Sequence, residues 1–204
     1  MNVYVESNFV LELALLQEQH PSCDAIVELA AADRIHLVIP AYSLVEHYET
    51  LTRFFRKRQA ITEAVRDELR QLGRSAPYEA QTAALEELTI LFTRSQEEER
   101  TRLRSTLARL VTVAELIPLT SAIIADSLSH QDEGFSPQDA VVYSSVLRHL
   151  KGGDGGEHMF LNRNSKDFDA PDVQDRLEAM NCRILFQFDA GLRYIRHRLG
   201  DADA

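Results

Sequence analysis

Near its start the chain reads Asn2-Val3-Tyr4-Val5-Glu6-Ser7-Asn8, a short strand-forming run followed at once by an acid. The apolar, β-branched character of Asn2–Val5 predicts a strand, and the helical spacing of 9–16 predicts a helix after it. A second apolar run, Ile35–Ile39, predicts a buried strand that Pro40 ends. This order of strand, helix and buried strand favours a parallel sheet with helical connections.

The rest of the chain continues the alternation of strands and helices. Short apolar runs predict three further strands, at Val111–Ile117, Met159–Leu161 and Arg183–Phe186. Helical spacing predicts helices at 22–32, 121–130, 136–150, 172–181 and 190–199. We therefore expect an α/β fold, a three-layer α/β/α sandwich whose central parallel sheet has about five strands.

Residues 41–111 differ from the rest because they are helical almost throughout, with one break at Gly73–Pro77. This pattern predicts two long helices that form a hairpin between the second and third strands. We expect one domain of residues 1–204 that carries the hairpin as an insertion. Such an enlarged hairpin is a candidate surface for RNA contact, for dimerisation, or for both.

Charge is unevenly distributed along the 204 residues, which hold 32 acidic and 22 basic side chains for a net charge of −10. Residues 41–111 carry 12 of those 22 basic residues but only 11 of the acids, and arginine dominates. Arginine suits phosphate oxygens, although Glu–Arg pairs on a solvated face are the simpler alternative. The acidic remainder argues against nucleic-acid binding through a basic patch alone.

Several classes of protein are disfavoured by the composition. No apolar run reaches the roughly 20 residues of a membrane helix, and the N-terminal residues lack the pattern of a secretory signal. Cys23 and Cys182 show no CxxC spacing, so both are expected to be buried thiols. We expect a cytoplasmic protein without membrane contact.

Four acids follow the expected strands at one edge of the sheet. Glu6 ends the first strand, Glu46 lies two turns into the helix after the second, and Asp139 lies in the first turn of a helix that leads to the fourth. Asp167 comes six residues after Leu161. If the first and fourth strands are neighbours, all four carboxylates converge on the crevice where ligands bind in such sheets.

Converging carboxylates repel one another unless a hard cation neutralises them, which makes Mg²⁺ or Mn²⁺ the natural occupant. Such an ion can bind a phosphodiester oxygen and lower the pKa of a bound water. Two alternatives stay open for single residues. Ser136 and Asp139 have the spacing of a helix capping box, and Glu46 also fits an exposed helix position.

Four short motifs occur in a recognisable order: Val3–Val10, Pro40 to Glu46, Asp139-Ala140-Val141 and Asn162–Phe168. They resemble the strand-Asp-Thr-Asn, Pro-x-x-x-x-x-Glu, Asp-Ala and Thr-x-Asp-x-x-Asp-Phe elements of PIN-domain ribonucleases, including the toxin-type members. The resemblance spans nearly the whole chain except the hairpin. It implies a PIN-like fold and metal-dependent endonucleolytic cleavage of RNA.

The resemblance assigns roles to residues of this chain. It implies that Glu6, Glu46, Asp139 and Asp167 hold the metal and position water, while Asn8, Asn162 and Asn164 support them. Substrate phosphate is assigned to Arg163 beside the acids and to Arg53 and Arg56 on the hairpin. The expected partners are RNA, a second copy of the chain and, if the chain is a toxin, an antitoxin-like protein.

Three positions depart from the family pattern: Glu6 replaces the usual Asp, Asn164 replaces an Asp found in many members, and Asn162 replaces Thr. These departures favour one alternative, a catalytically degenerate PIN module that binds RNA or a protein partner without cleavage. A structure-specific DNA nuclease is a third interpretation.

Overall fold

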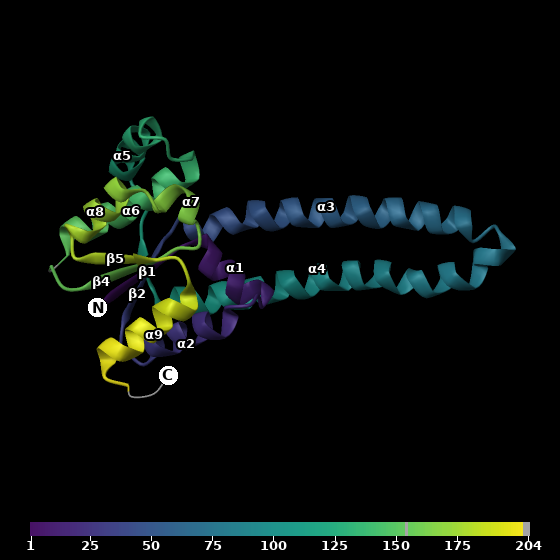
Figure 1. Cartoon of the computed structure of the whole chain (residues 1–204), viewed down its shortest axis with the longest axis horizontal. Coiled ribbons are helices and arrows are strands. Elements are labelled where there is room, and N and C mark those ends of the chain that lie inside the picture. Colours follow the sequence, from purple (N-terminus) through teal and green to yellow (C-terminus); the bar gives the residue numbers. More distant parts are fainter. Residues whose placement is uncertain (154, 202–204) are drawn as a thin grey trace.

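The computed structural model describes residues 1–153 and 155–201, apart from the side chains of 79–81 and 83–86. Its centre is a sheet of five parallel strands in the order β3-β2-β1-β4-β5 (Figure 1). The strands are β1 (Asn2–Val5), β2 (His36–Pro40), β3 (Glu115–Ile117), β4 (His158–Leu161) and β5 (Cys182–Leu185). The expected five-stranded parallel sheet is therefore confirmed.

The strand order reverses its direction between β1 and β4. From β1 the chain adds β2 and β3 on one side, and it then crosses to add β4 and β5 on the other. Tyr4 pairs in register with Val38 of β2 and with Phe160 of β4. The first and fourth strands are thus neighbours, as the convergence of the acids requires, and the residues that follow them meet at a topological switch point.

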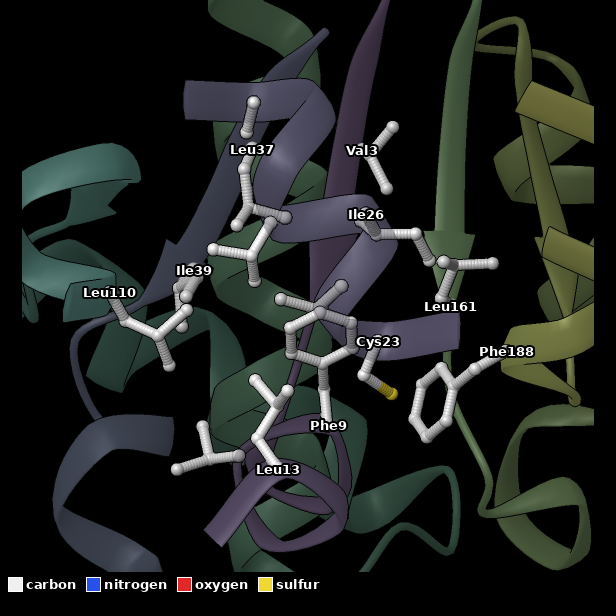
Figure 2. Packing of buried hydrophobic residues seen from close by; sticks show 14 of the residues in the cluster. Val3, Phe9, Leu13, Cys23, Ile26, Leu37, Ile39, Leu110, Leu161 and Phe188 are labelled. Atoms are coloured by element: carbon white, nitrogen blue, oxygen red, sulfur yellow. The ribbon is translucent and has the colours of Figure 1, made fainter. Parts of the chain in front are cut away.

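Helices cover both faces of the sheet, because alternate residues of β1 enter two different cores. Val3 and Val5 pack on one face with α1 (Ser7–Leu15), α2 (His20–Ala31), part of α4 (Glu79–Val113) and α9 (Phe188–Leu199). Figure 2 shows Phe9 of α1 and Phe188 of α9 near Cys23 in this core.

The opposite core begins with Tyr4 of β1, whose side chain is fully buried. It packs with α5 (Ser121–Asp132), α6 (Pro137–Gly152) and α8 (Pro171–Glu178). Two buried cores on either side of one sheet are the arrangement expected of a three-layer α/β/α sandwich.

A long helical hairpin separates β2 from β3 and projects away from the sheet (Figure 1). It consists of α3 (Ser43–Leu72), the short 3₁₀ turn η1 (Ala76–Tyr78) and α4. The strand expected over Val111–Ile117 is shorter than predicted, because α4 continues to Val113. Leu110 explains the difference, since its fully buried side chain continues the helical face of α4 into the core.

The base of the hairpin is held by α1, which packs against both α3 and α4. One helix was not expected from the sequence: α7 (Ser165–Phe168), a single turn whose Phe168 side chain is fully buried. None of the helices in the described residues combines the length and the apolar character needed to cross a membrane.

Gly191 allows α9 to approach the end of β4 closely. A Cβ atom at this position would lie 2.5 Å from Cδ2 of Leu161, whose side chain is fully buried. We predict that Gly191→Ala lowers the free energy of unfolding by about 1–3 kcal/mol, because the packed core must shift to make room. In urea denaturation, Gly191→Ala combined with Leu161→Ala should cost less than the sum of the two single changes. Additive costs would show that the two residues are not in contact.

Candidate functional site

A cleft of about 750 Å³ opens at the carboxyl edge of the sheet. Its lining includes Glu6 after β1, Glu46 of α3 and Asp139 of α6, together with side chains of α1 and of the segment after β4. Three of the four predicted acids, which are 40 to 133 positions apart in the chain, therefore share one cavity. Asp167, the fourth, is not part of its lining.

Glu6 is the most deeply placed of these acids, with only 7% of its surface exposed. It caps α1, because its Oε2 accepts a hydrogen bond of 2.9 Å from the backbone N–H of Asn8. Its Oε1 is buried without a hydrogen-bond partner among the described residues. Burial raises the pKa of Glu6 to about 7, and the negative charges of Glu46 and Asp139 act in the same direction.

Glu46 faces the cleft from the first turns of α3. The Ser7 hydroxyl donates a hydrogen bond to its Oε2, which joins α1 to α3 at this point. Burial raises the pKa of Glu46, and the charges of Asp139 and Glu49 raise it further. The alternative of an exposed helix position does not describe Glu46, whose carboxylate is half-buried and hydrogen-bonded.

Asp139 both takes part in the cap of α6 and lines the cleft. The Ser136 hydroxyl accepts a hydrogen bond of 3.2 Å from the Asp139 backbone N–H and donates one of 2.5 Å to its Oδ2, so the two residues cap α6. The Asp139 carboxylate also lines the cleft, and burial raises its pKa. Capping thus orients this carboxylate toward the cavity.

Asn164 links the remaining predicted acid to the cleft. Its side-chain amide nitrogen donates to Oδ1 of Asp139 at 3.1 Å and to Oδ2 of Asp167 at 2.8 Å. The backbone N–H of Asn164 donates in turn to Oδ1 of the buried Asn162 at 2.7 Å. Asn164 lines the cleft while Asp167 does not, so Asp167 reaches the site through the Asn164 amide.

The predicted phosphate-binding arginines lie in three different settings. Arg163 lines the cleft, but its guanidinium also donates to Glu12 of α1, whose side chain is fully buried. Arg53 lines the cleft and makes no ion pair with any residue that the structure describes. Arg56 is exposed on α3 outside the lining of the cleft.

Glu12, the buried partner of Arg163, was not predicted from the sequence. It accepts a hydrogen bond of 3.0 Å from the backbone N–H of Gln19 as well as the bond from Arg163. The sequence does contain one signal of this interaction. Glu12 is a lone acid within the apolar run 9–16, and a carboxylate that is buried with such a run requires a partner.

As the side chains stand in residues 1–153 and 155–201, no three His, Cys, Asp or Glu groups are gathered closely enough to hold one metal ion. No protein-family model, curated protein or solved structure matches the chain. The function of this cleft is therefore inferred from its own geometry and charge.

The raised pKa of Glu6 predicts how stability depends on pH in the absence of metal. Its pKa is about 7 in the folded protein and 4.5 in the reference state, so folding favours the protonated form. The free energy of unfolding is not reduced by this carboxyl group below pH 4.5. The reduction grows as the pH rises toward 7 and is complete above 7. We predict that Glu6→Gln, which keeps a capping oxygen, is more stable than the wild type by about 1–3 kcal/mol at pH 8.

Urea denaturation in EDTA at pH 8 and at pH 4 measures this difference, with Asp132→Asn on the exposed end of α5 as the control. The advantage of Glu6→Gln should shrink at pH 4, and the control should show no such change. An equal effect of Glu6→Gln at both pH values would contradict a raised pKa.

The Glu12–Arg163 pair predicts a structural role for an arginine that also faces the cleft. Arg163→Ala leaves the fully buried Glu12 carboxylate without its ion pair, which should cost about 3–5 kcal/mol of unfolding free energy. Adding Glu12→Met removes the stranded charge and should restore much of that loss. Thermal denaturation of the single and double variants tests this, and a double variant less stable than Arg163→Ala would refute it.

Proposed function

We propose that the cleft is the active site of a PIN-like, metal-dependent endoribonuclease. One observation carries the proposal: carboxylates from the end of β1, from α3 and from α6 share one cavity at the switch point of a parallel sheet. Capping of α1 accounts for Oε2 of Glu6, but its Oε1 is buried without a hydrogen-bond partner among the described residues and is the atom that calls for a functional explanation.

The order of elements supports the PIN-like part of the proposal. Glu6, Glu46 and Asp139 occupy three of the four motif positions, and each one lines the same cleft. The Asn162–Phe168 motif follows β4, the strand beside β1, and supplies Asn164 to that cleft. Motifs that are weak as isolated strings are thus brought together by the fold.

The donor set fits Mg²⁺ or Mn²⁺. All three acids offer oxygen, the ligand atom that these ions prefer, and the buried Oε1 of Glu6 lacks a partner among the described residues. Glu6, Glu46 and Asp139 would hold the ion, because all three line the same cleft. When bound, such an ion binds a phosphate oxygen and acidifies a water for attack on phosphorus.

Other residues of the chain orient these groups. Ser7 fixes the carboxylate of Glu46, and Asn164 fixes that of Asp139. Arg53 and Arg163 place positive charge on the cleft wall, where a substrate phosphate needs it. The acidic cavity would otherwise repel RNA, so these arginines and the cation supply the attraction together.

Asn164 favours a second candidate, the PIN-like module that binds RNA or a protein without cleavage. It stands where many family members have an acid, and its amide already satisfies one oxygen of Asp139 and one of Asp167. Fewer acids would then remain for a metal, which is the physical basis of a degenerate site.

Cleavage of a labelled single-stranded RNA in Mn²⁺ separates the two candidates. We predict that Asp139→Asn lowers the cleavage rate at least about 100-fold, because it removes a charged oxygen ligand while keeping the side-chain shape. Asp132→Asn on α5, which does not line the cleft, is the matched control and should retain full activity.

Matched single-stranded DNA, assayed in parallel, tests the choice of nucleic acid. If the protein cleaves the DNA and not the RNA, the proposed function changes from ribonuclease to DNA nuclease. Equal or absent cleavage by the wild type and Asp139→Asn would favour the non-cutting module.

A further inference from the structure

We propose that Phe54 of α3 is a stacking platform for a nucleobase of the RNA bound in the cleft. The inference rests on the proposed function, because it assigns a recognition residue within the same cavity. Phe54 would hold a base of the RNA, whereas the acids would act at the phosphate that is cleaved.

The position of Phe54 on α3 is the first support. Glu46, Thr50, Arg53 and Phe54 all line the cleft, and their spacing of three to four residues puts them along one side of a helix. Glu46 marks the acidic end of this wall. Phe54 lies two turns further along α3, in the direction in which the hairpin leaves the sheet (Figure 1).

The exposure of Phe54 is the second support. Its side chain is 38% exposed, and no other phenylalanine in the described residues is exposed to this extent. The phenylalanines of the two cores, such as Phe9 and Phe160, are completely buried. An aromatic ring that is left open on the wall of a polar cavity offers a flat apolar face to a ligand.

Arg53 supplies the complementary charge beside this ring. Its Cζ lies over the Phe54 ring at 5.9 Å from the ring centroid, and its guanidinium forms no ion pair within the described part of the chain. A cation held at an exposed aromatic ring, with no carboxylate to neutralise it, matches the alternation of phosphate and base along a single strand. Every base can stack on a phenyl ring, so Phe54 and Arg53 together would bind the strand without selecting its sequence.

A protein segment packed on Phe54 is the competing occupant. The guanidinium of Arg53, together with the cation that the proposed function places among the acids, favours a polyanion, and we therefore commit to RNA. An apolar peptide would cover the guanidinium of Arg53 without supplying a negative charge to pair with it.

The experiment separates base stacking from cleavage. Binding of a fluorescein-labelled single-stranded RNA is measured by anisotropy in the Asp139→Asn background, with and without Phe54→Ala. A second RNA of equal length, with abasic riboses at its central positions, keeps the phosphates but lacks the bases there. Ile61→Ala, which removes another exposed apolar side chain of α3 outside the cleft, is the control.

Phe54→Ala should weaken binding of the ordinary RNA about ten-fold and leave binding of the abasic RNA unchanged. Phe54→Tyr should restore the affinity, and Ile61→Ala should have no effect on either RNA. Equal weakening for both RNAs, no weakening, or no binding of RNA at all would overturn the inference. If the wild type binds RNA through Phe54 but does not cleave it, the stacking role of Phe54 stands and the nuclease proposal is wrong. Failure of the stacking role and failure of the nuclease proposal therefore give different results.

Discussion

Three carboxyl groups partly or fully buried in one cleft are the constraint around which this end of the sheet is organised. Glu6, Glu46 and Asp139 lie in one cleft, burial raises the pKa of each, and each carboxylate is affected by the charge of at least one other acid. A protein tolerates such a group when the arrangement has a use, because neutral side chains would remove the cost. The use that we propose is the binding of a divalent cation, which would neutralise the mutual repulsion of the carboxylates.

The fold imposes this arrangement through simple local rules. The switch point between β1 and β4 brings the ends of two strands together, and α1 begins directly at Glu6, which caps it. Asp139 is held by the capping of α6, so the interactions that start two helices also aim two carboxylates. Helix capping and the candidate chemistry therefore use the same two residues, and these acids are difficult to alter without cost to the fold.

Much of this organisation could be predicted from local sequence patterns. Periodicity located the strand at Asn2–Val5, the helical hairpin and three of the four acids at the carboxyl edge, because each depends on short-range spacing; Asp167 does not line the cleft. Long-range pairing was beyond its reach: no local signal connects Glu12 with Arg163, or shows that Asn164 stands between Asp139 and Asp167. The end of α4 at Val113 was also missed, because a β-branched apolar stretch fits a strand and a buried helix equally well.

If the cleft carboxylates bind a divalent cation together, crystals soaked in MnCl₂ and measured at the manganese absorption edge will reveal it. We expect an anomalous peak in the cleft, within bonding distance of carboxylate oxygens of Glu6 and Asp139. A cleft without manganese at saturating concentration, with the Glu6 carboxyl instead bonded to a protein cation, would rule out a shared metal site.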